Sequence, residues 1–293
     1  MPQDVRRIQV DGVGIRVEQG GSGDGAPVVF VHGWLRAAQE WRYLLPHFQQ
    51  VARCVALDLP GCGGSDAPED APYTVPWLAD VLRGTLDALG IERARLFTHG
   101  LGGAVGIRLS LDHPERVEHH VSASPSTFPN PLEGLRGRYI TRSPLGQVGA
   151  RWFFTRERVR RMLLDRQYHE PLRVDDALID AVMAPLERPG GRDAAWKLLL
   201  ADMDPGLGDD LPALRVPTTL IWGYSDKVNL VDLAKRLEAE LECVVLNQIP
   251  NCGYQAIETR PLSVAIYAAR AFGLPLPEGI EDGHPTPGTM NFA

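Results

Sequence analysis

The segment Thr98, His99, Gly100, Leu101 and Gly102 bears most directly on chemistry in this chain. Apolar residues before it favour a strand, and small and apolar residues after it favour a helix. Such a turn between a strand and a helix is where the motif G-x-S-x-G holds a serine on strained backbone, so that its hydroxyl projects as a nucleophile. Gly100 stands in the serine's place. The spacing therefore predicts the turn of a nucleophile without its reactive oxygen.

Three further motifs follow one another along the chain. They are a run ending in His-Gly-Trp, the pattern D-x-P-G-x-G-x-S and the sequence D-H-P-E-R-V, at residues 27–34, 58–65 and 112–117. Together with the turn at Gly100, they resemble the α/β-hydrolase fold family over residues 6–272. The resemblance implies an α/β fold with a mainly parallel eight-stranded sheet, flanking helices and a helical cap inserted after strand six. It also implies an oxyanion hole, a set of backbone N–H donors, at Gly33, Trp34 and Leu101.

Two segments near the C-terminus resemble the parts of the family that carry the other catalytic residues. The segment 218–228 places the catalytic acid at Asp226, and the segment 249–261 has Tyr254 where the family has its catalytic histidine. The triad positions therefore contain Gly100, Asp226 and Tyr254. Loss of the serine or the histidine costs about 10⁶ in kcat in another serine hydrolase, so ordinary triad hydrolysis is not expected. A phenol has a pKa near 10, and we expect Tyr254 to act as a hydrogen-bond donor.

Other candidate groups have structural interpretations. His99 is expected to point into the scaffold, and Ser124 occupies a place where some relatives carry a substitute acid. Cys62 and Cys252 lie on loops near the expected site, but no imidazole is evident that could generate a thiolate. His32 either braces the backbone of its loop or lines the substrate site.

Composition favours one globular unit. The chain has 293 residues, of which 44% are hydrophobic and 23% charged, with a formal net charge of −7. The absence of basic clusters argues against nucleic-acid binding, and no apolar run reaches the length of a membrane helix. No metal-ligand spacing and no G-x-G-x-x-G fingerprint occur, so we expect no metal and no cofactor. We expect a cytoplasmic monomer or homodimer with reduced cysteines.

Alternating strand and helix patterns predict the domain organisation. Core residues are expected at 1–124 and 212–273, a helical cap at 125–211 and a flexible tail at 274–293. Helices are predicted at 38–48, 75–89, 101–113, 231–241 and 261–272 in the core, and at 132–140, 156–164, 176–183 and 193–201 in the cap. An Asp11-Gly12 turn joins two predicted strands, at 6–10 and 15–19.

A cap over the carboxyl ends of parallel strands is expected to enclose an apolar ligand site. Its walls are predicted from side chains of the core and the cap: His32, Trp34, Leu101, Tyr254, Trp152, Phe153, Phe154 and Trp196. The expected function is cofactor-free oxygenation of a hydrophobic aromatic or polyketide-like compound, with dioxygen in the space left by the missing serine. Two alternatives are a non-catalytic small-molecule receptor and a hydrolase with relocated or engineered-out catalytic groups.

Overall fold

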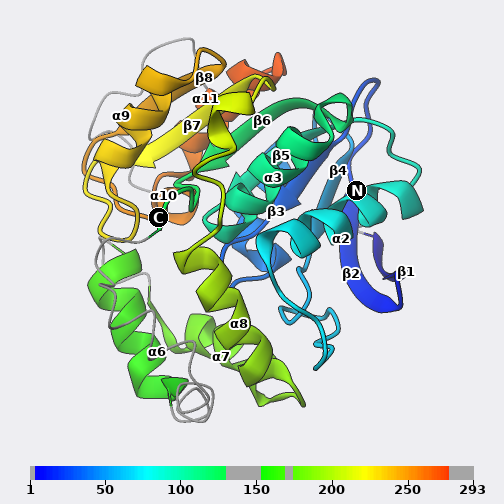
Figure 1. Ribbon diagram of the computed structural model, residues 1–293, viewed down its shortest axis with the longest axis vertical. Helices are drawn as coiled ribbons and strands as arrows, with labels where there is room; N and C mark the ends of the chain where they lie inside the picture. The colour runs from blue at the N-terminus through cyan, green and yellow to red at the C-terminus, as the bar shows by residue number, and fades with distance from the viewer. Residues whose placement is uncertain (1–3, 130–152, 169–173, 277–293) are drawn as a thin grey trace.

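The computed structural model describes residues 4–129, 153–168 and 174–276. The described chain contains one eight-stranded sheet (Figure 1). Its strands are β1 (Asp4–Val10), β2 (Val13–Gly20), β3 (Val28–Val31), β4 (Cys54–Leu57), β5 (Ala94–His99), β6 (Val117–Ala123), β7 (Thr218–Gly223) and β8 (Val244–Ile249). The predicted hairpin at the start is present, with Asp11 and Gly12 both at positive φ.

The strand order places the expected site at the carboxyl ends of the inner strands. The order is β1-β2-β4-β3-β5-β6-β7-β8, with β2 antiparallel to β1 and β4 and all other neighbours parallel. Val31 pairs with Thr98, and His99 pairs with Ala123, so β3, β5 and β6 end side by side. The mainly parallel eight-stranded sheet predicted from the sequence is confirmed.

Helices cover both faces of the sheet. One apolar cluster joins α2, α3 and α9 to the sheet, and a second joins η1, α1, α10 and α11 to its other face. The core helices are η1 (Ala38–Trp41), α1 (Leu45–Phe48), α2 (Val75–Ala88), α3 (Leu101–Asp112), η2 (Pro114–Arg116), η5 (Leu211–Ala213), α9 (Val231–Glu240), α10 (Ala256–Thr259) and α11 (Pro261–Phe272).

A separate group of helices lies below the sheet in Figure 1. They are α6 (Arg156–Met162), η3 (Leu163–Gln167), α7 (Asp176–Glu187) and α8 (Gly191–Met203). Two contacts tie α8 to loops at the carboxyl ends of strands. Trp34 Nε1 donates to the carbonyl of Ala195 at 2.9 Å, and Ser126 Oγ donates to Asp202 Oδ1 at 2.6 Å. These helices are placed as the predicted cap would be, over the expected site.

Some predicted boundaries differ from the structure. The helix predicted at 38–48 is two short helices, because Pro46 lacks the N–H that would continue one helix through this point. The helix predicted at 132–140 and all of the tail beyond residue 276 lie outside the described residues, and the division into core and cap remains a prediction. Within the described part of the chain, no helix is both long and apolar enough to cross a membrane.

Candidate functional site

The turn at Gly100 has the geometry of a nucleophile-bearing turn. Gly100 joins β5 to α3 with φ 51° and ψ −117°, a conformation that residues with a side chain rarely adopt. Its N–H donates to the carbonyl of Ala123 at 3.2 Å, and its carbonyl accepts from the N–H of Ser126 at 3.1 Å. The strained turn is therefore held by the end of β6 and the loop after it, but it presents no side chain.

The hydroxyl of Tyr254 occupies the space of the missing side chain. A Cβ atom built on Gly100 would overlap the Tyr254 hydroxyl oxygen and lie 3.1 Å from Cζ. From the sequence, this space was expected to hold dioxygen. That expectation is wrong, because the tyrosine fills the space itself.

Tyr254 is a neutral phenol in this environment. The side chain is buried, and burial, together with the carboxylates of Asp202, Glu40 and Asp226, raises the pKa of its hydroxyl well above the usual value. A phenol in this state is a poor base and nucleophile but a good hydrogen-bond donor. Its protonation agrees with the role expected from the sequence.

Two of the three expected oxyanion donors are available. The N–H groups of Trp34 and Leu101 donate to no acceptor among the described residues, and Leu101 begins the 12-residue helix α3, whose positive end favours a negative charge. Gly33 does not fit this role, because its N–H donates to Glu40 Oε2 at 2.9 Å. Of the three expected donors, the N–H groups of Trp34 and Leu101 are therefore the two that stay open for such a role among the described residues.

Asp226 keeps half of its hydrogen-bonding capacity unused. Its Oδ1 accepts from the N–H groups of Val228 at 2.7 Å and Asn229 at 3.0 Å, whereas Oδ2 has no partner among the described residues. Burial raises the pKa of Asp226 to about 6, although the two backbone hydrogen bonds and the nearby hydroxyl of Ser124 lower it. The Ser124 hydroxyl itself meets no partner at hydrogen-bond geometry in the described part of the chain. Asp226 is thus close to the pKa that suits a general base at neutral pH.

His32 braces its loop and does not line a ligand site. Its ring is fully buried, Nδ1 donates to the carbonyl of Gly33 at 2.8 Å, and Nε2 accepts from the N–H of Leu59 at 2.9 Å. Burial lowers the pKa of this imidazole, so it stays neutral. The expectation that His32 contacts substrate is corrected, because both ring nitrogens are already bound.

The aromatic side chains that were predicted to line the ligand site contact one another in the described part of the chain. The ring of Trp34 lies 6.3 Å from that of Phe154, and Phe153 lies 5.6 Å from Trp196, as measured between ring centroids. Phe153 is 39% exposed, whereas the other three rings and Leu101 are buried. Trp152 lies outside the described residues. Of these rings, Phe153 has the most surface left for a ligand, and the others pack the cap against the core.

Sequence reasoning missed two acidic residues beside the site, Glu40 and Asp202. Glu40 and His99 bind each other under the turn, with His99 Nδ1 at 3.1 Å from Glu40 Oε1. Asp202, on α8, reaches Ser126 beside Gly100. No local motif marks these residues, because their partners are 59 and 76 residues away in the sequence.

The cysteines near the site are not arranged as nucleophiles. Burial raises the pKa of the Cys62 thiol far above its usual value. Cys252 is fully buried, with its sulfur 3.5 Å from Thr259 Oγ1. Among the described residues, no group of three or more histidine, cysteine, aspartate or glutamate side chains could hold a metal ion.

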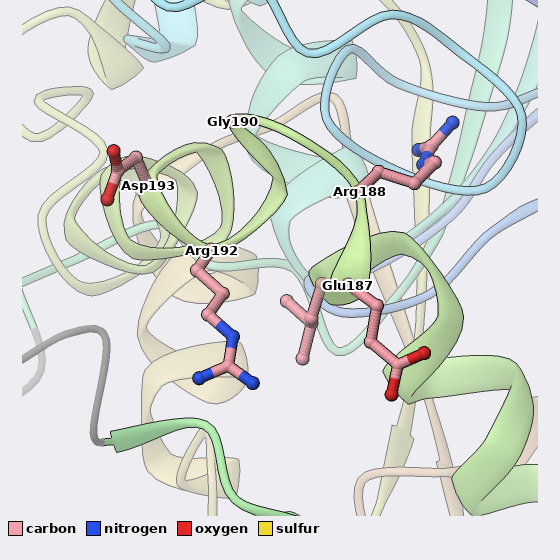
Figure 2. Close-up of a pocket in the computed structure, with 6 residues that line it drawn as sticks. Glu187, Arg188, Gly190, Arg192 and Asp193 are labelled. Carbon is pink, nitrogen blue, oxygen red and sulfur yellow. The ribbon is translucent and has the colours of Figure 1, made fainter.

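A separate hollow of about 440 Å³ lies where α7 leads into α8. It is lined by Leu186, Glu187, Arg188, Gly190, Arg192 and Asp193 (Figure 2). Figure 2 shows Arg188 directed to the opposite side from Glu187 and Arg192. None of the predicted site residues lines this hollow, and its mixed charges select no ligand class.

The family model and the relatives that match this chain belong together. The family model described as "alpha/beta hydrolase fold" matches residues 26–261. An uncharacterized hydrolase, YugF, from Bacillus subtilis (strain 168) is 27% identical over 270 residues, which cover 90% of this chain and 96% of the relative. The 2-hydroxymuconate semialdehyde hydrolase of Pseudomonas sp. (strain CF600) is 27% identical over 265 residues, covering 86% of this chain and 89% of the relative.

Solved structures agree with this result at the level of the fold. The epoxide hydrolase CorEH superposes with a TM-score of 0.80 at 19% identity, covering 93% of this chain and 99% of that protein. The family model spans most of the chain, and its fold is the one observed in the described residues. The chain is therefore a member of the α/β-hydrolase fold family.

Proposed function

We propose that this chain is a hydrolase of small carbonyl compounds in which no residue forms a covalent intermediate and Tyr254 donates a hydrogen bond in place of the lost serine. The observation that carries the proposal is the position of the Tyr254 hydroxyl in the space of the nucleophile side chain. A neutral donor there lies beside the carbonyl group that a serine would attack, where it can donate to the carbonyl oxygen. Among the alternatives drawn from the sequence, this is the hydrolase with relocated groups.

The proposed reaction uses water as its nucleophile. Water adds to the carbonyl carbon and passes a proton to Asp226, whose unpartnered Oδ2 can accept it. The developing oxyanion receives hydrogen bonds from the N–H groups of Trp34 and Leu101 and from the Tyr254 hydroxyl. When the carbonyl re-forms, the leaving group departs with the proton that Asp226 had taken, so the enzyme returns to its starting state.

The relatives support a substrate class. Their names include 2-hydroxymuconate semialdehyde hydrolase and 2-hydroxy-6-oxo-6-phenylhexa-2,4-dienoate hydrolase. Both names describe conjugated carbonyl compounds, in the second case with an aromatic ring. The partly exposed ring of Phe153 offers an apolar contact for such a ring. We therefore propose conjugated oxo-dienoates as the first substrates to test.

Two other interpretations are less well supported. Oxygenation rested on an empty space above Gly100, which Tyr254 fills, and the relatives named above are hydrolases. An engineered loss of the serine does not account for a tyrosine that fits the vacated space. The fit favours a natural pair of substitutions.

The test compares the wild type with Tyr254→Phe in the turnover of 2-hydroxymuconate semialdehyde and 2-hydroxy-6-oxo-6-phenylhexa-2,4-dienoate. Turnover is measured as the loss of substrate absorbance. Loss of one oxyanion donor is expected to lower kcat by about 10². Tyr73→Phe is the matched control, because Tyr73 is equally buried and its hydroxyl donates to the carbonyl of Pro68 away from the site. Its kcat should equal that of the wild type.

Isotope labelling identifies the reaction. With H₂¹⁸O, label should enter the product at the cleaved carbonyl, and with ¹⁸O₂ no label should enter. Label from ¹⁸O₂ would overturn the proposal in favour of oxygenation. Tight binding of both compounds without turnover would overturn it in favour of a receptor.

A further inference from the structure

A buried charged cluster lies under the turn at Gly100, and the proposed reaction does not use it directly. At its centre is Glu40, in η1, whose side chain is fully enclosed. Glu40 Oε2 accepts the N–H of Gly33 at 2.9 Å, and Oε1 accepts Nδ1–H of His99 at 3.1 Å. Arg36 Nε lies 3.4 Å from Oε1. One carboxylate thus joins the loop after β3 to the last residue of β5.

His99 extends this connection to the tyrosine. Its Nε2 lies 3.2 Å from the backbone carbonyl of Tyr254, which can only accept a hydrogen bond. Since Glu40 Oε1 on the other side is also an acceptor, both ring nitrogens must carry protons to satisfy both contacts. Burial raises the pKa of Glu40, but the charges and hydrogen bonds of His99, Arg36 and Gly33 lower it to about 2, which keeps this carboxyl ionised.

Packing leaves this pair little freedom. A Cβ atom on Gly33 would lie 2.9 Å from His99 Nδ1, so the loop backbone passes directly over the imidazole. The rings of His99 and Tyr254 have centroids 4.4 Å apart. The imidazole is thus enclosed between the loop that carries one oxyanion donor and the residue that carries the proposed hydroxyl donor.

We infer that Glu40 and His99 are positioning residues, which fix the hydroxyl of Tyr254 relative to the backbone donor at Trp34. The chain of contacts from Gly33 through Glu40 and His99 to the Tyr254 carbonyl is the basis of this assignment. A buried ion pair adds little net stability, because desolvation offsets its attraction, so we assign the pair a geometric role. This inference rests on the proposed function, since it names what holds the proposed donor in place.

Two variants separate geometry from charge. His99→Phe keeps an aromatic ring but removes both donors, so kcat should fall by about 10- to 100-fold while KM changes by less than about three-fold. Glu40→Gln can retain both links in neutral form: the amide oxygen accepts from Gly33, and the amide NH₂ donates to Nδ1 of a His99 that has lost that proton. Its kcat should stay within about five-fold of the wild type.

Glu258→Gln is the matched control. Glu258 is an equally buried carboxylate of the same region, but it binds Arg42 and Tyr168 and makes no contact with Gly33 or His99. It should change thermal stability without changing kcat. If His99→Phe keeps the wild-type kcat, or if Glu258→Gln loses as much kcat as His99→Phe, the positioning role is refuted.

A spectroscopic measurement tests the inference without turnover. Nitrogen-15 NMR of the wild-type protein should show His99 protonated on both nitrogens at pH 7, and Glu40→Gln should show it protonated on one. A neutral His99 in the wild type would refute the inference, even if His99→Phe does not fold. In one outcome, the wild type shows no turnover while His99 is protonated on both nitrogens and loses one proton in Glu40→Gln. This result would count against the proposed function and still support the link between Glu40 and His99.

Discussion

Restoring the serine alone should destabilise the protein. In Gly100→Ser the new Cβ would overlap the Tyr254 hydroxyl, and the turn would hold a side chain at φ 51°. Positive φ costs about 1 to 2 kcal/mol for a residue with a side chain, and overpacking a buried site costs about 1 to 3 kcal/mol. The free energy of unfolding should therefore fall by roughly 2 to 5 kcal/mol, as measured by urea denaturation.

Gly90→Ser is the control for this prediction. Gly90 has φ 65°, and a Cβ there would meet nothing within 4 Å, so only the backbone cost of about 1 to 2 kcal/mol applies. The double variant Gly100→Ser with Tyr254→His should recover the overpacking cost and approach the stability of Gly90→Ser. It should also react with a fluorophosphonate probe, whereas the wild type and Gly100→Ser should not. Equal stability of Gly100→Ser and Gly90→Ser would refute the steric argument, and stoichiometric labelling of the wild type would refute the loss of serine chemistry.

Asp226 leads to two further predictions and Trp34 to a third. Because folding raises the pKa of Asp226 from 3.8 to about 6, its contribution to stability is complete below pH 4 and lost as pH rises to about 6. Asp226→Asn should remove this loss and be more stable than the wild type at pH 7 by about 2 to 3 kcal/mol in denaturant titrations. The wild-type kcat/KM should rise with pH through about 6, as the base ionises, and a flat profile would exclude Asp226 as the base. Trp34→Phe removes the hydrogen bond from Trp34 Nε1 to the carbonyl of Ala195. It should lower the stability in thermal unfolding by about 1 kcal/mol more than Trp41→Phe, because Trp41 Nε1 has no partner among the described residues. Equal losses in the two variants would show that the hydrogen bond contributes nothing to stability.

The sheet and the turn at Gly100 could be predicted because they are encoded locally. Strand and helix alternate with clear turn signals, and the motif around Gly100 contains its own strand, turn and helix. The prediction of one helix at 38–48 was wrong because Pro46 lacks a backbone N–H, which is also a local feature of the sequence. Positions of elements were therefore recoverable from residues close together in the sequence.

The contacts that define the site could not be predicted in this way. Gly33 looked like an oxyanion donor until its N–H was found on Glu40, and nothing in the motif specifies that bond. The hydroxyl of Tyr254 reaches Gly100 only because β5 and β8 are parallel and end on the same side of the sheet, so that the turn after β5 meets the loop after β8. Hydrogen-bond partners of buried groups depend on side-chain directions in the folded chain, which spacing along the sequence does not determine.

The fit between Gly100 and Tyr254 also constrains how such a site can arise. Between the serine and histidine of the family pattern and the glycine and tyrosine found here lie two possible single-substitution intermediates. Glycine with histidine leaves an open space, whereas serine with tyrosine places two groups in the same volume. A route from that pattern to this one therefore avoids the overlap only if the serine is replaced before the tyrosine is acquired. In the same way, Tyr254 would have to be replaced before a side chain at position 100 could fit, so the tyrosine obstructs the introduction of a serine there.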